Sequence, residues 1–267
     1  MTNLWSNRLK TVITDRENKK PMLQIGFKCN RGVVRKNNED ACFLIPNQDV
    51  YIVADGVGGN NSGEIASSTA VESLASFVKA GDLKSLKTPE EIFGFFTEAV
   101  DAANSDVYEM NQENLNYRGM ATTLVMTYIR DGSAYVTNIG DSRAYLFRNG
   151  RLKRITKDHT YVNELIDKGI ITEREAESHS QKNVITKALG AEPQAEPDFY
   201  KVALERGDIM ILCSDGLYGE VGEDRMTELL KDAYENETKM NDLCADFVDE
   251  AILAGGRDNI TVICIRV

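Results

Sequence analysis

The sequence predicts an α+β sandwich in which helices lie on the outside and antiparallel β-sheet lies within. Two turn signals, Asp131-Gly132 and Asn149-Gly150, each join two runs that are rich in strand-forming residues, and such dipeptides favour tight hairpins. Two pairs of segments carry apolar residues at helical spacing, which indicates helices that bury one face. Strands that pair locally and helices that cover them are typical of a layered α+β fold.

Length and composition favour one acidic domain. The chain has 267 residues, of which 42% are hydrophobic, and this is sufficient for a single large core. The 42 acidic and 31 basic residues give a net charge of −11, which argues against sequence-independent binding of nucleic acid. The five cysteines show no Cys-x-x-Cys spacing, which indicates free thiols in a reducing compartment. No segment resembles a signal peptide or a membrane helix, so we expect a cytoplasmic protein without membrane contacts.

The first part of the chain is predicted to run from an extension through strands into two helices. Residues 1–24 are polar and are expected to form an N-terminal extension. Strands are predicted at 22–28, 41–45 and 51–54. Two helices follow. The first carries apolar residues from 65 to 78 and ends near 81, and the second begins with Thr88-Pro89-Glu90-Glu91, a capping-box pattern, and continues to about 110.

The rest of the chain is predicted to form strands, a polar flap and two further helices. The segment 157–190 is polar, lacks a strong apolar face and contains both histidines, so we expect a flap over a site. Four strands before it read as one antiparallel meander. The predicted strands are 122–130, 133–139, 142–148 and 151–156, then 209–213 and 260–265, and the predicted helices are 223–234 and 239–253.

Aspartates stand at the ends of several predicted strands. Asp55 ends an apolar run and is followed closely by glycines, Asp215 follows a second run in the same way, and Asp258 precedes the last run. One Asp-Gly pair alone indicates an ordinary turn. If these strands lie side by side, with the last antiparallel to the others, the three carboxylates meet at one sheet edge. Asp40 and Glu39, just before another strand, are further candidates, and such clustered negative charge argues for bound metal.

Eight short motifs occur in order between about residue 25 and the end of the chain. They are GVVRKNNEDA (32–41), VADGVGGNNSGEIAS (53–67), GMATTLV (119–125), NIGDSRAYL (138–146), KDHTYVNELIDKGIIT (157–172), ITKALG (185–190), LCSDGLYGEV (212–221) and GGRDNITVI (255–263). In this order they resemble the metal-dependent Ser/Thr protein phosphatases of the 2C (PPM) family, in their bacterial form. The resemblance implies a four-layer αββα sandwich over 25–267, with two antiparallel sheets flanked by helix pairs.

The resemblance also implies a site for two Mn²⁺ or Mg²⁺ ions. By motif match, Asp55 would bridge both ions, and the carbonyl of Gly56 would bind one of them. Asp215 and Asp258 would hold the other ion. An all-oxygen set of this kind suits hard cations and argues against zinc or copper.

Four further residues receive roles from the same match. Glu39 and Asp40 would lie close to the ions and hold water, and Asp141 would bind a third, weaker metal. Arg35 would bind the phosphate, for which a guanidinium is better suited than Lys; without the motif, it would be a surface arginine facing Glu39. The catalytic residues implied in this way are Arg35, Asp55, Asp215 and Asp258.

The implied reaction is direct hydrolysis of phosphoserine and phosphothreonine in proteins. Two ions share a bridging water, lower its pKa and aim it at phosphorus without a phosphoenzyme. The implied partners are phosphorylated proteins, among them a bacterial Ser/Thr kinase and its substrates, and the protein is expected to be a monomer. Two alternatives stay open: a phosphoprotein-binding module without turnover, and a hydrolase of another phosphorus ester or of a dedicated partner such as an anti-sigma-factor antagonist.

The general acid has no assignment in the sequence. Many eukaryotic members have a histidine after the first Asp-Gly pair, but this chain has Val57 there. His159 and His179 lie in matched segments, and for each we expect a structural or flap role rather than proton donation.

Overall fold

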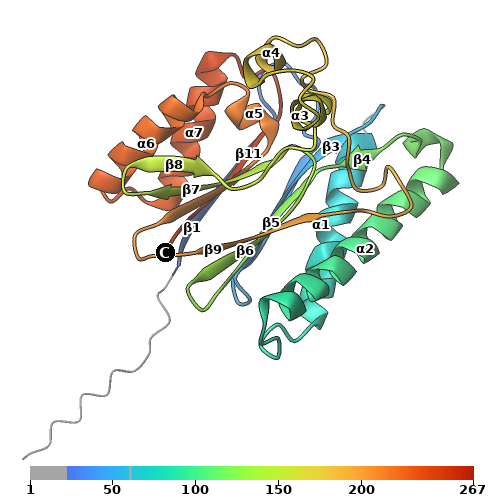
Figure 1. The fold of residues 1–267 in the computed structure, drawn as a ribbon, viewed down its shortest axis with the longest axis horizontal. Coiled ribbons are helices and arrows are strands. Elements are labelled where there is room, and N and C mark those ends of the chain that lie inside the picture. The colour runs from blue at the N-terminus through green and yellow to red at the C-terminus, as the bar shows by residue number, and fades with distance from the viewer. Residues whose placement is uncertain (1–22, 60–61) are drawn as a thin grey trace, which may run out of the picture.

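The computed structural model describes residues 23–59 and 62–267. Two antiparallel sheets are stacked on each other, and a pair of helices covers each outer face (Figure 1), which confirms the predicted four-layer class. The expected N-terminal extension lies outside the described residues up to position 22. Within the described ranges, we find no helix whose length and hydrophobicity would let it cross a bilayer.

The first sheet has the strand order β1, β11, β10, β7, β8, and its neighbours are antiparallel. The strand β11, which is last along the chain, lies between β1 and β10. Helices α6 and α7 pack on the outer face of this sheet through an apolar cluster. Its elements are β1 (Gln24–Asn30), β7 (Arg143–Arg148), β8 (Arg151–Arg154), β10 (Ile209–Cys213), β11 (Ile260–Arg266), α6 (Glu223–Glu235) and α7 (Met240–Ala254).

The second sheet has the order β2, β3, β5, β6, β9, and the short strand β4 also pairs with β3. Helices α1 and α2 cover its outer face. The capping box predicted at Thr88 is present at the start of α2, with Pro89 as its first residue. The elements are β2 (Asp40–Ile45), β3 (Val50–Val57), β4 (Ala121–Thr122), β5 (Leu124–Arg130), β6 (Ser133–Ile139), β9 (Asp198–Ala203), α1 (Ser62–Ala80) and α2 (Pro89–Glu113).

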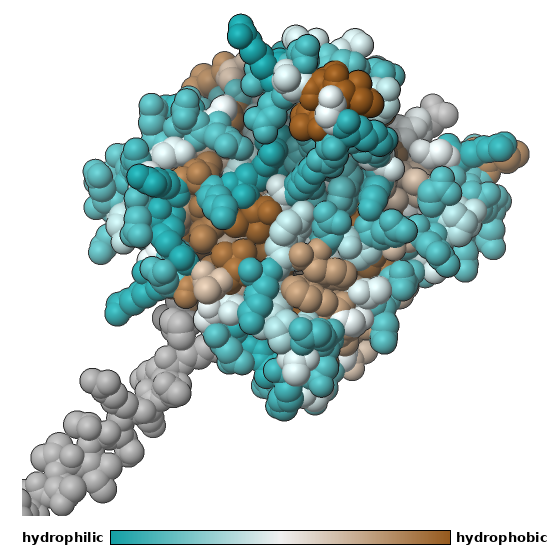
Figure 2. All heavy atoms as spheres, in the orientation of Figure 1, coloured by the Kyte–Doolittle hydropathy of each residue, from teal (hydrophilic) through white to brown (hydrophobic). Residues whose placement is uncertain are grey.

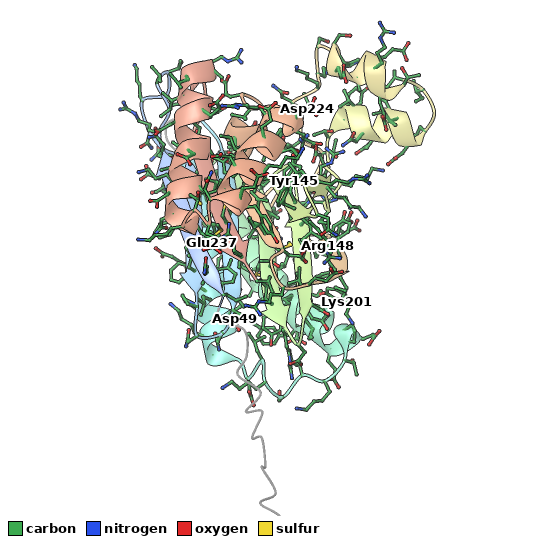
Figure 3. All side chains as sticks on the ribbon, turned by 90° about the vertical axis from the view of Figure 1, so that its left-hand side faces the viewer. Asp49, Tyr145, Arg148, Lys201, Asp224 and Glu237 are labelled. Atoms are coloured by element: carbon green, nitrogen blue, oxygen red, sulfur yellow. The ribbon has the colours of Figure 1, made fainter. Side chains whose placement is uncertain are left out.

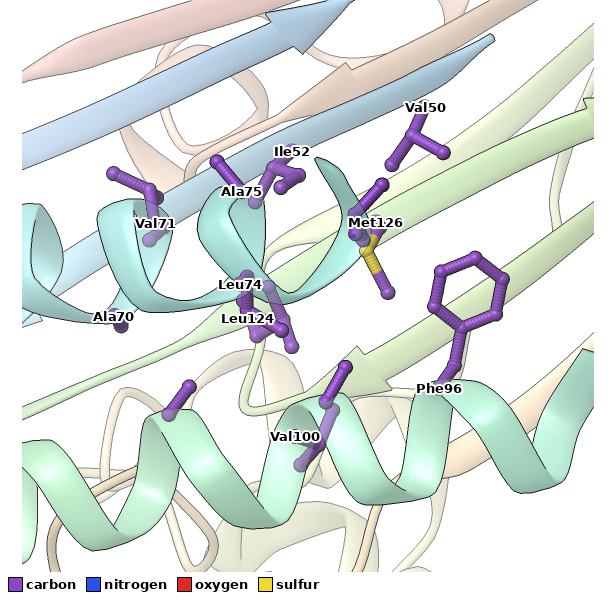
Figure 4. Close-up of a cluster of buried hydrophobic side chains, with 14 of the residues drawn as sticks. Val50, Ile52, Ala70, Val71, Leu74, Ala75, Phe96, Val100, Leu124 and Met126 are labelled. Carbon is purple, nitrogen blue, oxygen red and sulfur yellow. The ribbon is translucent and has the colours of Figure 1, made fainter. Parts of the chain in front are cut away.

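Three apolar clusters hold the layers together. One lies between α1, α2 and the second sheet, where Leu74, Phe96 and Val100 are fully buried (Figure 4). Another lies between α6, α7 and the first sheet, and the third lies between the two sheets. Truncating one large side chain in such a core typically costs about 3–5 kcal/mol. The strand ends that carry the site are therefore fixed by packing on both faces of each sheet.

The predicted four-strand meander is wrong in its sheet assignment. β5 and β6 form one hairpin in the second sheet, whereas β7 and β8 form another in the first sheet. The chain crosses between the sheets at Gly140–Ser142, where Gly140 has a φ of 92° that favours glycine. The turn dipeptides specify each hairpin locally, but they carry no information about which sheet a hairpin joins.

The segment predicted as a flap contains two short helices, α3 (Tyr161–Asp167) and α4 (Glu173–Glu177). The side view shows this segment projecting beyond the layers (Figure 3). The predicted capping box at Thr172 is present at the start of α4. In Figure 2 a brown apolar cluster lies in the region of α3 and α4, and the exposed apolar residues of the segment include Ile170 and Val184.

Three further elements were not predicted. β9 is a half-exposed strand at the edge of the second sheet, and it pairs with β6. A single turn of helix, α5 (Asp215–Tyr218), follows β10, and a 3₁₀ turn, η1 (Leu115–Tyr117), follows α2. The two short helical elements carry too few apolar residues for periodicity to identify them.

Candidate active site

The structure brings all but one of the predicted site residues to the wall of a single pocket of about 290 Å³. The pocket lies where strands of both sheets end or begin. Asp40 is the exception, because it is buried beside the pocket and does not line it. The lining residues are Arg35, Glu39, Asp55, Gly56, Val57, Gly58, Thr123, Asp141, Asn183, Ile185, Asp215, Asp258 and Asn259.

The three strand-end aspartates converge across two sheets and not within one. Asp55 lies in β3 of the second sheet. Asp215 comes two residues after β10, as the first residue of α5, and Asp258 comes shortly before β11. These two strands are antiparallel neighbours in the first sheet. The condition under which convergence was expected, that β3 lies beside these strands in one sheet, is not met. The aspartates still meet because the two sheets are stacked with these strand ends on the same side.

Hydrogen bonds from the second sheet fix the backbone of Asp55. Its N–H donates to Thr123 Oγ1 at 2.9 Å, and its carbonyl accepts from the N–H of Thr123 at 2.8 Å and from Thr122 Oγ1 at 3.0 Å. The hydroxyl oxygens of Thr123 and Ser142 lie 2.7 Å apart. This contact also fixes the crossover after β6 next to Asp55. The position of the Asp55 carboxylate is thus set by the backbone and by two threonines.

The glycines after Asp55 permit a backbone contact that side chains would block. A Cβ atom on Gly56 would lie 2.0 Å from the carbonyl oxygen of Gly63, and one on Gly63 would lie 2.9 Å from Cδ of Glu39. The N–H of Gly56 also donates to the carbonyl of Glu39 at 3.0 Å. The start of α1, the end of β3 and the Glu39 backbone are therefore packed together beside the pocket.

Asp40 is a buried carboxylate, and only one of its two oxygens has a hydrogen-bond partner among the described residues. It pairs with Asp55 across β2 and β3, and its Oδ2 accepts from Ser214 Oγ at 2.8 Å. Its Oδ1 is buried and has no hydrogen-bond partner among the residues that the structure describes. Burial, together with the negative charge of Asp215, raises the pKa of Asp40 to about 7. A buried carboxylate oxygen without a donor is costly in a protein and is readily satisfied by a cation or its water.

The carboxylates around the pocket repel one another. Burial raises the pKa of Asp55 well above its usual range, and the charges of Asp40, Asp215, Asp141 and Asp258 raise it further. Burial and then the charge of Asp258 raise the pKa of Asp215. In the same way, burial and Asp215 raise the pKa of Asp141 to about 7. The pocket therefore holds more negative charge than its own surroundings compensate.

Arg35 is the only cation among the described residues that line the pocket. Its Nη2 donates to Asp258 Oδ2 at 2.7 Å, and its Nη1 lies 4.0 Å from Glu39 Oε2. Its side chain is 48% exposed, so the guanidinium remains accessible from solvent. The alternative that Arg35 chiefly faces Glu39 is less well supported, because the contact with Asp258 is the shorter one.

The segment 31–39, which presents Arg35 and Glu39, is held by a buried amide that the sequence reasoning did not single out. Asn259 Nδ2 donates to the carbonyls of Arg31 at 2.8 Å and Asn37 at 2.9 Å. Its Oδ1 accepts from the N–H of Glu39 at 2.8 Å. The Asp-Asn pair in GGRDNITVI is the only sequence signal for this role. Asn259 therefore couples the start of β11 to the loop on the opposite side of the pocket.

The turn that carries Asp141 is supported by an ion pair. Arg143 donates to Asp158 through Nε at 3.0 Å and Nη2 at 2.7 Å, and its guanidinium carbon lies 3.4 Å from the ring centre of Tyr218. The hydroxyl of Tyr218 donates to the carbonyl of Asp141 at 2.9 Å. Sequence reasoning missed all three supporting residues, because their partners are distant along the chain or look like surface charges.

Neither histidine lines the pocket. His159 Nδ1 accepts from the N–H of Gly140 at 3.1 Å, and its Nε2 lies 3.2 Å from Asp198 Oδ2. His179 Nδ1 accepts from the N–H of Gln181 at 3.1 Å. The Nδ1 of His159 is thus engaged in a structural contact with the Gly140–Asp141 turn, whereas its Nε2 lies near Asp198 without a hydrogen bond to the described residues.

The residues of the pocket fit a hard divalent cation. The lining residues offer carboxylate, carbonyl and amide oxygens and no thiol or imidazole, which is the donor set of Mn²⁺ and Mg²⁺ sites. In the part of the chain that the structure describes, no three His, Cys, Asp or Glu side chains form a finished coordination cluster. The donors instead surround the pocket, with excess negative charge and the unpartnered Asp40 oxygen beside it.

A larger hollow of about 730 Å³ lies elsewhere, beside Gln48, Arg130 and Leu204. It is lined by two cations, Lys84 and Arg130, and Arg130 is already engaged, because its Nη1 donates to the carbonyls of Leu83 at 2.7 Å and Leu86 at 2.6 Å. The smaller pocket contains the buried carboxylates, and the chemistry therefore favours it over the larger one.

Known proteins resemble this chain in sequence and in fold. The family model described as Protein phosphatase 2C matches residues 33–251. Serine/threonine phosphatase stp of Listeria monocytogenes serotype 4b is 35% identical over 243 residues, which cover 90% of this chain and 94% of that protein. The structure of the S. agalactiae serine/threonine phosphatase has a TM-score of 0.85 and 33% identity, covering 92% of this chain and 99% of that one. The catalytic domain of the serine/threonine protein phosphatase PstP, in complex with two manganese ions, has a TM-score of 0.78 and 32% identity, covering 91% and 97%.

Proposed function

This chain belongs to the protein phosphatase 2C family, and from that premise we propose that it hydrolyses phosphoserine and phosphothreonine in proteins by direct attack of water. It is a protein serine/threonine phosphatase, as its relatives are. The observation that carries the proposal is the convergence of Asp55, Asp215 and Asp258 beside Arg35 in one pocket.

The proposed metal ligands follow from the donor set of the pocket. Asp55, the carbonyl of Gly56, Asp215 and Asp258 would hold two ions, and the two manganese ions of PstP support that number. Glu39 and Asp40 would hold water beside the ions, and Asp141 would hold a third ion. When bound, Mn²⁺ or Mg²⁺ supplies Lewis acidity, which lowers the pKa of water and offsets phosphate charge.

The residues of the chain itself bind and orient the substrate. Arg35 binds phosphate oxygens, and its present contact with Asp258 keeps the guanidinium at the pocket wall. Thr123 is committed to Asp55 and Ser142 through its hydroxyl group. Because the lining residues include no serine, cysteine or histidine, the proposal has no need of a covalent intermediate on those side chains.

The segment 157–190 is proposed to act as a flap that contacts the substrate. Two of its residues, Asn183 and Ile185, line the pocket. The phosphatase domain would span 25–267, and residues 1–24 would be an extension. We further assign the protein to the cytoplasm as a monomer that opposes a Ser/Thr kinase. Its cysteines are free thiols, which suits a reducing compartment.

Removal of metal is expected to abolish turnover. The test is the initial rate of phosphate release from a phosphothreonine peptide by metal-stripped protein, titrated separately with Mn²⁺, Mg²⁺ and EDTA. Activity should appear with Mn²⁺ and disappear with EDTA, because the buried carboxylates require a cation. If the reloaded protein binds Mn²⁺ but releases no phosphate from a panel of phosphopeptides, the binding-module alternative replaces the enzyme. Release from another phosphorus ester alone would support the other alternative.

Replacement of Arg35 should chiefly weaken substrate binding. Arg35→Ala removes charge-assisted hydrogen bonds worth about 1.5–3 kcal/mol, so we expect KM for the phosphopeptide to rise roughly tenfold to a hundredfold. kcat should change little if the contact is equally good in the ground and transition states. Arg35→Lys is the matched control, since it keeps the charge but loses the bidentate geometry. A lower kcat with unchanged KM in Arg35→Ala would contradict this role.

A further inference from the structure

Two cysteines face each other across one edge of the sandwich. Cys29 lies in β1, the edge strand of the first sheet, and Cys42 lies in β2, the edge strand of the second sheet. Their Sγ atoms are 3.3 Å apart. Nothing in the proposed phosphatase reaction uses this pair, although it connects the two sheets at the place where the loop carrying Arg35 begins and ends.

Cys29 and Cys42 differ from the other three cysteines in their exposure to solvent. Cys29 and Cys42 are partly exposed, whereas Cys213, Cys244 and Cys264 are buried. A small oxidant in solution can therefore reach the pair at the sheet edge before it reaches the core thiols. A hydrogen bond from Cys42 also lowers the pKa of Cys29 to about 7, so Cys29 supplies the more reactive sulfur.

We propose that Cys29 and Cys42 form a reversible disulfide in the presence of a peroxide, and that this cross-link inhibits the phosphatase. The effect on turnover rests on the proposed function, whereas the cross-link itself does not. The pair is thus a redox-modification site at the edge of the sandwich.

The chemistry balances with hydrogen peroxide as the oxidant. The Cys29 thiolate attacks one peroxide oxygen, the O–O bond breaks, and the departing hydroxide takes a proton to become water. Cys29 is then a sulfenic acid. The sulfur of Cys42 attacks the sulfenic sulfur, forms the S–S bond and releases the second water. The two thiols lose two electrons in total, and the peroxide gains them.

The cross-link would shift residues beside the pocket, because Cys42 lies on the same strand as Asp40. A disulfide requires the sulfurs to approach from 3.3 Å to about 2.05 Å, which draws β1 and β2 together. Asp40 lies two residues before Cys42 and therefore on the same face of β2. The new bond would close a covalent loop from Cys29 to Cys42, and this loop contains the segment that presents Arg35 and Glu39. A misplacement of about 1 Å in a catalytic constellation can cost on the order of a hundredfold in rate.

The test uses the full-length, metal-loaded protein, reduced first with dithiothreitol and then freed of it. Aliquots are treated with increasing hydrogen peroxide, the remaining thiols are alkylated, and each aliquot is divided between mass spectrometry and the phosphothreonine-peptide assay. Cys29→Ser is the matched variant, since it removes one partner at a partly exposed position. Cys42→Ala is a second variant in case the first one folds poorly.

We expect a protein lighter by two hydrogens, a peptide cross-link between Cys29 and Cys42, and at least a tenfold loss of kcat that dithiothreitol restores. Both variants should keep their activity under the same peroxide treatment. The proposal is overturned if both thiols are alkylated after oxidation, or if the cross-link forms and kcat is unchanged. If the reduced protein itself releases no phosphate, the proposed function fails, and the mass measurement alone decides whether the disulfide forms.

Discussion

Asp55→Asn is expected to lower kcat by about a hundredfold to a thousandfold and at the same time to stabilise the metal-free protein. The loss of activity follows because the carboxylate is the proposed shared ligand, and removing one central electrostatic group typically costs about 10²–10³-fold. The gain in stability follows because burial and four neighbouring carboxylates raise the pKa of Asp55. A neutral amide of the same size relieves that repulsion.

The two effects are measured separately. Phosphate release from a phosphothreonine peptide with saturating Mn²⁺ gives kcat, and thermal unfolding in EDTA gives the stability. Asp131→Asn is the matched control, because Asp131 is an exposed hairpin residue that takes positive φ, which asparagine tolerates. Full activity in Asp55→Asn would refute the site assignment. A lower melting temperature of that variant in EDTA would refute the account of carboxylate repulsion.

The metal-free protein is expected to lose stability as the pH rises from about 4 to about 7. In the folded state the pKa values of Asp40 and Asp141 are each about 7, above the usual value of 3.8, chiefly because of burial. The folded state therefore binds more protons than the unfolded state across this window. The stabilisation is complete below the unfolded pKa and is lost as the pH rises through the folded pKa.

Calorimetry in EDTA between pH 4.5 and pH 8, chosen as roughly the limits of this titration, tests the prediction. The melting temperature should fall by roughly 2–4 °C for each kcal/mol of stability lost. With saturating Mn²⁺ the fall should be smaller or reversed, because the cation binds the deprotonated carboxylates. A melting temperature in EDTA that rises steadily up to pH 8 would contradict the raised pKa values.

The repeated pattern of a strand and an aspartate pointed to carboxylates that do meet, although the single-sheet arrangement assumed for them is not the observed one. Asp55, Asp215 and Asp258 line one pocket, as that pattern indicated. The assignment of strands to sheets could not be predicted in the same way. Hairpin dipeptides act over a few residues, whereas the crossover at Gly140 depends on packing between layers.

The residues that support the site could not be predicted from the sequence, for a different reason. Asn259 acts by hydrogen bonds to backbone groups of Arg31 and Asn37, more than 200 positions away along the chain. Any residue type can provide a backbone carbonyl, so the partners leave no pattern. Arg143 and Asp158 likewise resemble surface charges in the sequence, although their side chains are only 16% and 7% exposed in the fold.

The position of β11 has a consequence for protein synthesis. β11 is the last strand along the chain, yet it lies between β1 and β10. While a ribosome is still making the chain, β1 has no sheet partner in place, and Asp258 and Asn259 have not yet been added. Native pairing of these strands must wait until β11 has left the ribosomal tunnel, because contacts between such distant segments form late. An incomplete nascent chain that ends before β11 therefore lacks Asp258 and Asn259, two of the residues that line the pocket.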